Sequence, residues 1–406
     1  MAPRQRADLT FKDNLKRARH GWVRLTPAYS VKIVEQILFK NPNIKYILDP
    51  FSGTGTTGLV AGQYGLRCDL YEINPFLLWL AKVKCANYSS DRIRDTKEIA
   101  YKIVDFARRD RDDHGLWLPF ISNIERWWSP NRLVVLAKVF QAINKFLPEL
   151  CQEKDLLLVA FCRLIIQWSN AAFNHQSMSF KENSSQCRMF DEDEEIYQVF
   201  LNDLDEILLE ASYNITGVVS THLFDSRNIA INDTSHGYDA VITSPPYVNR
   251  MSYIRELRPY MYWLGYLKSA REAGELDWEA IGGTWGVATS RLNDWSPDGV
   301  SEILPRLNPL IEEIAQSSEV LSRYVHKYFE DISRHLSGLY HVVAPGGQLY
   351  YIVGNSKFYD TLVPAEELYV DLMKKHGFEN THIEVIRKRN SKKELFEFLV
   401  SATKPL

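Results

Sequence analysis

Residues 46–58 read YILDPFSGTGTTG, a short apolar run followed by a glycine-rich turn and the start of a predicted helix. Runs of the same kind, bounded by turn residues, predict buried strands at Tyr46–Phe51, Cys68–Ile73, Val218–Phe224, Asp239–Thr243 and Gln348–Val353. Helical patterns separate several of these runs. Such an alternation of strands and helices predicts an α/β fold with a mainly parallel sheet.

Two further stretches complete the predicted organisation. His382–Ile386 and Leu395–Val400 are apolar runs separated by polar residues, and they predict an antiparallel hairpin at the sheet edge. Residues 89–215 have helical periodicity without a comparable strand pattern, which predicts a helical insertion. Within it, the polar segment Asn174–Cys187 and the acidic run Asp191–Glu195 predict an exposed loop.

The composition is that of a soluble globular protein. Hydrophobic residues make up 45% of the 406 residues and charged residues 24%, and no apolar run approaches the roughly 18 residues that a membrane span needs. The polar, basic N-terminus does not resemble a signal peptide, so we expect a cytoplasmic protein. Five cysteines without a C-x-x-C pair, and ten histidines without H-x-x-x-H spacing, predict neither a disulfide framework nor a metal site.

The formal net charge of −3 gives no overall attraction to nucleic acid, so binding to a polyanion would depend on local basic patches. Two such patches exist. The first contains Arg4, Arg6, Lys12, Lys16, Arg17, Arg19 and Arg24, and the second contains Arg387, Lys388, Arg389, Lys392 and Lys393. A charge run is often only a solvated face, and the sequence leaves both interpretations open for each patch.

The glycine-rich turn is the first candidate ligand site. Gly53 to Gly58 satisfies the G-x-G-x-x-G pattern of dinucleotide-binding loops, and Glu72 would then bind the ribose. Leu59 stands where a phosphate-binding loop requires lysine, which excludes that loop type. Asp49 ends the preceding strand, where its charge would repel a pyrophosphate but could attract the ammonium of a methionine group. The loop therefore favours S-adenosylmethionine over a dinucleotide.

Ser244-Pro245-Pro246-Tyr247 is the second candidate site, and it follows a predicted strand at the carboxyl edge of the sheet, where α/β folds bind ligands. Two prolines fix the backbone and leave carbonyl groups free to accept hydrogen bonds. Ser244 Oγ and the Pro245 carbonyl could hold both hydrogens of an exocyclic amine and direct its lone pair. Tyr247 would stack on the base, which must leave a duplex to reach such a pocket.

Both motifs resemble those of the DNA amino-methyltransferase family. The loop is similar to its cofactor motif, and Ser-Pro-Pro-Tyr is similar to the form found in cytosine-N4 enzymes, whereas adenine-N6 enzymes mostly carry Asp or Asn first. The resemblance covers most of residues 20–90 and 217–400. It implies a Rossmann-like class I methyltransferase sheet, S-adenosylmethionine as cofactor, double-stranded DNA as substrate and a cognate restriction endonuclease as a candidate partner.

The resemblance also implies roles for individual residues. The expected catalytic residues are Ser244, Pro245, Pro246 and Tyr247, and the expected cofactor-binding residues are Thr26, Asp49, Phe51, Gly53, Gly55, Glu72, Asn74 and Asp225. Asp225 would accept from the adenine amino group, although a helix cap is an alternative. Residues 1–88 and 216–406 would form the catalytic domain. Residues 89–215, or a second irregular insertion at 268–315, would recognise the target sequence.

Other functions remain alternatives at this point. An adenine-N6 DNA methyltransferase could use the same pocket, and an RNA methyltransferase could act on an exocyclic amine, although no RNA-binding domain is recognisable. A nicotinamide-dependent oxidoreductase would explain the glycines but not Ser244–Tyr247. A non-catalytic DNA-binding module would explain the basic patches but neither motif.

Overall fold

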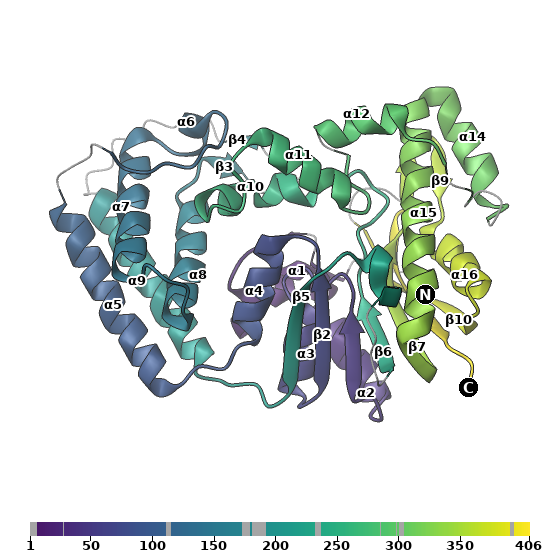
Figure 1. Ribbon diagram of the computed structural model, residues 1–406, viewed down its shortest axis with the longest axis horizontal. Coiled ribbons are helices and arrows are strands. Elements are labelled where there is room, and N and C mark those ends of the chain that lie inside the picture. Colours follow the sequence, from purple (N-terminus) through teal and green to yellow (C-terminus); the bar gives the residue numbers. More distant parts are fainter. Residues whose placement is uncertain are drawn as a thin grey trace.

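The computed structural model describes residues 6–26, 28–110, 115–172, 179–180, 192–231, 237–284, 286–297, 299, 304–389 and 394–406 (Figure 1). A seven-stranded sheet is formed by β1 (Tyr46–Asp49), β2 (Arg67–Glu72), β5 (Val218–Leu223), β6 (Tyr238–Thr243), β7 (Val343–Gly354), β10 (Glu379–Lys388) and β11 (Phe396–Thr403). The strand order is β10-β11-β7-β6-β1-β2-β5. The predicted strands are thus all present.

The direction of the strands matches the predicted fold class. β5, β2, β1, β6 and β7 run parallel to one another, whereas β11 pairs antiparallel with β7 and with β10. β10 lies at the edge of the sheet, as expected for the final hairpin. The α/β, Rossmann-like class with a mainly parallel sheet and a C-terminal antiparallel hairpin is therefore confirmed.

Helices cover both faces of the sheet, which explains why its central strands carry apolar side chains on both faces. Ile47 of β1 packs in a cluster with α2 (Val31–Lys40) and α3 (Thr56–Gln63). Its neighbour Leu48 packs on the other face, in a cluster with α15 (Glu319–Val342) and α16 (Ala365–Lys375). Both side chains are fully buried. The sheet is therefore the middle of three layers.

The stretch with predicted helical periodicity is a helical bundle beside the sheet (Figure 1). Its elements are α5 (Ser90–Arg109), α6 (Ile124–Trp127), α7 (Pro130–Phe146), α8 (Gln152–Gln167), a short pair of strands β3 (Ala171–Ala172) and β4 (Ser179–Phe180), and α9 (Glu192–Ala211). Trp127, Trp128, Trp168 and Trp263 are all buried in one hydrophobic cluster that also includes α4 (Pro75–Cys85). These four side chains are therefore core residues.

Two expectations about irregular structure need correction. The described part of the acidic run, Glu192–Glu195, is the first turn of α9, where carboxylates interact favourably with the helix dipole; most of Asn174–Cys187 lies outside the described residues. Residues 268–315 were expected to be irregular, but they contain α11 (Ala270–Glu279), α12 (Val287–Asp294) and most of α14 (Leu307–Ser317). These helices are short and separated by glycine-containing turns, so their periodicity is weak in the sequence.

α10 (Tyr253–Trp263) and α11 lie across the carboxyl ends of the parallel strands (Figure 1). The N-terminal segment, with η1 (Ala7–Leu9), α1 (Phe11–Asn14) and η2 (Ala18–Gly21), precedes α2. In the described part of the chain, no helix is both long and apolar enough to cross a membrane.

Candidate functional site

A cavity of about 110 Å³ lies at the carboxyl edge of the sheet. Part of its wall comes from the N-terminal segment (Leu25, Ala28 and Tyr29), the glycine loop (50–54 and Thr56), and the end of β2 with α4 (72–74 and Leu77). The rest comes from the residues after β5 (224–226), α10 (Tyr253 and Ile254) and the end of α11 (279–281). Ser244 and Pro246 of the sequence Ser244–Tyr247, here termed the tetrapeptide, also line it. The cavity therefore joins the two predicted motifs.

Most of the predicted site residues meet at this cavity. Phe51, Gly53, Glu72, Asn74, Asp225, Ser244 and Pro246 line it, whereas Thr26, Asp49, Gly55, Pro245 and Tyr247 lie next to lining residues without belonging to the wall. Seven predicted residues, up to 195 positions apart in the sequence, thus line one cavity. The sequence prediction missed the contributions of Tyr29 and of the end of α11.

The glycine loop is shaped by its backbone. Gly55 has φ 80° and ends the loop where α3 begins, a left-handed conformation that favours glycine. A Cβ atom at Gly58 would lie 2.6 Å from Leu70 on β2, so glycine allows α3 to pack closely on the sheet. At Gly53, which has φ 51°, a Cβ would meet no atom within 4 Å. The loop therefore presents its backbone to open space.

Asp49 braces the loop from beneath. Its buried carboxylate accepts hydrogen bonds from the Phe51 amide (3.1 Å), the Thr243 hydroxyl (2.5 Å) and the Tyr29 hydroxyl (2.9 Å). The Tyr29 hydroxyl also contacts Thr57. Burial raises the pKa of Asp49 to about 6. The carboxylate thus ties the loop to β6 and to the N-terminal segment, and it is not on the cavity wall.

Glu72 is the carboxylate that does reach the cavity. One of its oxygens accepts from the Gly53 amide (2.8 Å) and the other from the Asn74 amide (2.9 Å), which leaves lone pairs for a ligand. Burial raises its pKa to about 7. The Asn74 side chain caps α4 by accepting from Phe76 and Leu77 amides, so Asn74 offers the cavity little beyond its backbone.

Asp225 also lines the cavity, directly after β5. It accepts from the Arg227 amide (3.0 Å) and from the Arg227 guanidinium (2.7 to 3.0 Å). Burial opposes ionisation, but the Arg227 hydrogen bonds and charge outweigh it, and the pKa of Asp225 lies below its ordinary value. Arg227 also donates to Asp331 (3.2 Å) and to the Glu279 carbonyl (2.6 Å). It therefore joins β5, α15 and the end of α11.

The hydrogen bonds of the tetrapeptide leave some of its oxygen atoms able to accept hydrogen bonds from a ligand. The Ser244 hydroxyl donates its own proton to the Ile352 carbonyl on β7 (3.0 Å), which leaves the oxygen lone pairs of Ser244 free to accept. The Pro246 carbonyl is already occupied by the Tyr328 hydroxyl (2.7 Å). Among the described residues, no hydrogen bond reaches the Pro245 carbonyl. Both expected acceptors, Ser244 Oγ and the Pro245 carbonyl, can therefore still accept hydrogen bonds.

Tyr247 is fixed by the C-terminal hairpin. Its hydroxyl donates to Glu397 (2.7 Å), which is buried and also accepts from Arg387 (2.7 Å). The ring packs against Gly354 so closely that a Cβ there would lie 2.7 Å from two ring carbons. The Arg389 guanidinium lies 5.4 Å from the ring centre. Glu397 and Gly354 were not predicted, because nothing in the local sequence links them to the tetrapeptide.

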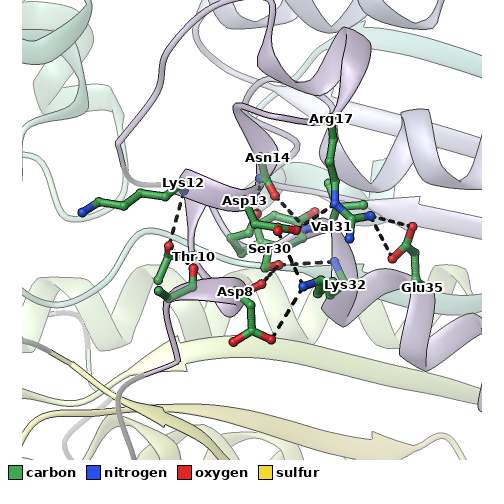
Figure 2. Close-up of polar contacts among 12 residues, drawn as sticks. Asp8, Thr10, Lys12, Asp13, Asn14, Arg17, Ser30, Val31, Lys32 and Glu35 are labelled. Carbon is green, nitrogen blue, oxygen red and sulfur yellow. Dashed lines mark hydrogen bonds and ion pairs between the residues drawn. The ribbon is translucent and has the colours of Figure 1, made fainter.

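Two described members of the first basic patch are ion-paired. Arg6 pairs with Asp8 (2.8 Å), and Arg17 pairs with Asp13 (2.7 Å) and with Glu35 on α2 (3.0 Å) (Figure 2). Lys32 of α2, which is not part of the patch, approaches Asp8 (3.6 Å) and Asp13 (3.5 Å). The Arg17 and Lys32 pairs join the N-terminal segment to α2, whereas Lys12 and Lys16 are exposed.

Two other residues anchor the same segment. The Asn14 side chain donates to the Tyr29 carbonyl (2.7 Å) and accepts from the Val31 amide (3.0 Å) (Figure 2). Arg19, which is 2% exposed, donates to backbone carbonyls on both sides of the helical bundle, including Lys84 (3.0 Å) and Ala211 (2.8 Å). Asn14 thus positions Tyr29 at the cavity, and Arg19 is a structural residue.

No group of three or more potential metal ligands occurs among the residues that the structure describes.

The chain is similar to known proteins over nearly its whole length, although no protein-family model matches it. It is 23% identical to the Type II methyltransferase M.AvaI of Nostoc sp. (93% of this chain and 83% of that protein), 21% identical to M.MvaI of Kocuria varians (88% and 80%) and 22% identical to M.BsoBI of Geobacillus stearothermophilus (96% and 85%). The last two are also Type II methyltransferases.

A solved structure, the rRNA methyltransferase aviRa from Streptomyces viridochromogenes, covers 97% of this chain and 96% of its own, with 10% identity and a TM-score of 0.29, which is too low to establish a common fold. The sequence relationship is the informative one, because it spans both motifs and the strands between them. The chain is thus a distant homologue of Type II methyltransferases, as its two motifs predicted.

Proposed function

We propose that the protein is a DNA methyltransferase of a restriction-modification system that uses S-adenosylmethionine and methylates the exocyclic N4 of a cytosine flipped out of the duplex. The observation that carries this proposal is the single cavity shared by Glu72 and Ser244. Glu72 would bind the cofactor and Ser244 would bind the amine, so one cavity would hold both the donor and the acceptor of a methyl group. The Type II methyltransferase relatives support the same reaction class and DNA as the substrate.

The residues at the cavity fit this cofactor. Glu72 offers acceptor lone pairs suited to ribose hydroxyls, and Asp225 offers them for an adenine amino group. A Cβ at Gly53 would meet no atom within 4 Å, so the loop leaves room for a ligand beside its backbone. When bound, the cofactor would supply an electrophilic methyl group on a sulfonium. The protein contributes its orientation.

The tetrapeptide would act on the base. The lone pair of an exocyclic amine is delocalised into the ring, so the amine is a weak nucleophile. Ser244 Oγ and the Pro245 carbonyl would accept its two hydrogens and direct the lone pair towards the cavity. The Tyr247 ring would stack on the flipped base, and unstacking that base from DNA costs a few kcal/mol. Serine at the first position supports cytosine, because the resemblance associates it with cytosine-N4 enzymes.

Nucleoside mass spectrometry would test this function. Duplex DNA of mixed sequence would be incubated with the protein and S-adenosylmethionine carrying a deuterated methyl group, and then digested to nucleosides. Deuterated N4-methylcytosine is the expected product. Deuterated N6-methyladenine would overturn the assignment of cytosine, and label found only in RNA supplied in parallel would overturn DNA as the substrate.

A further inference from the structure

Arginines without carboxylate partners gather near the tetrapeptide. Many arginines of the described chain are ion-paired, as Arg17 is with Asp13 and Glu35. Arg250, Arg255 and Arg389, here termed the arginine track, make no ion pair with any described residue. Arg389 donates one hydrogen bond to the Asn355 carbonyl (2.9 Å), which holds the guanidinium in place without neutralising its charge. The three charges can therefore attract an external anion.

The three members of the arginine track come from three places along the chain. Arg250 is exposed and lies three residues after Tyr247. Arg255 stands in the first turn of α10, where its amide is bonded to the capping Ser252 hydroxyl (3.1 Å). Arg389 follows β10, and its guanidinium lies 5.4 Å from the Tyr247 ring centre. Arg250 and Arg389 therefore lie beside the tetrapeptide, and Arg255 directly follows Tyr253 and Ile254, which line the cavity.

The arginine track lies outside the cofactor cavity. None of its three members is among the residues that line the cavity. A second observation marks Arg255: Arg258, one turn further along α10, donates to the Arg255 carbonyl (3.2 Å), which keeps two guanidinium-bearing residues close together. Burial, and then the charge of Arg255, hold the pKa of Arg258 below its ordinary value.

We propose that the arginine track binds the phosphates of the DNA strand that carries the target base. This inference rests on the proposed function and specifies how the duplex is held. Arginine donates to phosphate oxygens in a forked geometry, and such contacts fix the position of a duplex without reading its sequence. Because the formal net charge is −3, attraction for DNA depends on local positive surfaces, and the arginine track is such a surface beside the tetrapeptide.

The test is the salt dependence of DNA binding. The dissociation constant of the full-length protein for a labelled duplex of mixed sequence would be measured by fluorescence anisotropy at increasing salt concentration. Each neutralised phosphate contributes about −0.9 to the slope of log K against log salt. Arg250→Gln, Arg255→Gln and Arg389→Gln should each reduce the slope by about 0.9 and weaken binding at low salt. Binding of S-adenosylmethionine should stay unchanged.

Arg17→Gln is the matched control, because it also removes one arginine but one that is already paired with carboxylates. It should leave the slope unchanged. A steep wild-type slope that none of the three track variants reduces would overturn the inference while leaving the proposed function intact. A wild-type protein that binds no duplex would instead overturn the proposed function, and tighter binding to RNA of the same sequence would replace DNA as the partner.

Discussion

The hydroxyl of Tyr247 lies 2.7 Å from a carboxylate oxygen of Glu397, a residue 150 positions further along the chain. Tyr247 ends the tetrapeptide, and Glu397 belongs to β11, the strand that pairs with β7 at Gly354. The C-terminal hairpin therefore sets the orientation of the ring that would stack on the base. The hairpin is part of the candidate site and not only the edge of the sheet.

Tyr247→Ala should reduce methyl transfer severely. Loss of one base-stacking contact removes about 1–3 kcal/mol, which corresponds to about a fivefold to 150-fold decrease in kcat/KM. Affinity for S-adenosylmethionine, measured by calorimetry, should stay nearly unchanged. Tyr247→Phe keeps the ring and should lose less activity than Tyr247→Ala. Equal loss of cofactor binding and activity in Tyr247→Ala would indicate a folding defect instead.

Gly354→Ala should disturb the Tyr247 ring by crowding it. The added Cβ would lie 2.7 Å from two carbons of Tyr247, a clash that must displace the ring or the strand. We expect a lower free energy of unfolding by about 1–3 kcal/mol, as is typical of overpacking. In the Gly354→Ala/Tyr247→Ala double variant the clash is absent, so the two effects should not add. Additive losses in urea denaturation would show that the clash lies elsewhere.

Glu72→Gln should weaken cofactor binding. Glutamine has an NH₂ group in place of one carboxylate oxygen, and this donor would face the backbone N–H of Gly53 or Asn74, which is also a donor. Binding by the wild-type protein should also weaken as the pH falls through about 7, where this carboxylate takes up a proton. Calorimetric titration with S-adenosylmethionine across that range checks both effects. If Glu72→Gln and the wild-type protein had the same dissociation constant for S-adenosylmethionine above pH 7, Glu72 would not be a cofactor-binding residue.

Asp49 should make stability depend on pH. Its pKa is about 6 in the folded protein and 3.8 in an ordinary setting. The folded protein thus binds the proton more tightly than the unfolded chain, and the resulting stabilisation is complete below about pH 4 and is lost as the pH rises through about 6. The loss corresponds to about 3 kcal/mol for a rise from 3.8 to about 6.

Asp49→Asn should remove this contribution, so urea denaturation between pH 4 and 7 should show a smaller decline than in the wild-type protein. Glu72 titrates over a similar range, so part of the decline should persist in the variant. Glu72→Gln serves as the parallel comparison. An identical pH dependence in Asp49→Asn and the wild-type protein would contradict the assigned role.

Tyr29→Phe should destabilise the glycine loop. The substitution removes the hydroxyl that donates to Asp49 and contacts Thr57, and a buried carboxylate that loses a donor costs about 1–3 kcal/mol. Thermal denaturation should show the loss, and cofactor affinity should fall because Tyr29 also lines the cavity. Asn14→Ala should have a smaller effect of the same kind, since it releases the Tyr29 backbone but keeps the hydroxyl. Unchanged cofactor affinity in both variants would limit the N-terminal segment to a structural role.

Much of this protein can be predicted from local sequence. The strands were found because parallel strands covered on both faces are continuous apolar runs, as at Ile47 and Leu48. The glycine loop and the tetrapeptide were found because each has an unusual backbone requirement that few residues meet, and both follow strands whose carboxyl ends share one edge. These features predicted the fold class and seven of the residues that line the cavity.

Only the tertiary structure decided which charges and hydroxyl groups meet. The partners of Asp49 are Tyr29 and Thr243, the latter 194 residues away, and the partner of Tyr247 is Glu397. The sequence does not distinguish Arg17 from Arg389, yet Arg17 is paired with carboxylates and Arg389 has no carboxylate partner among the described residues. The physical reason is that periodicity and turn chemistry act between neighbours along the chain, whereas hydrogen bonds and ion pairs depend on the packing of distant segments.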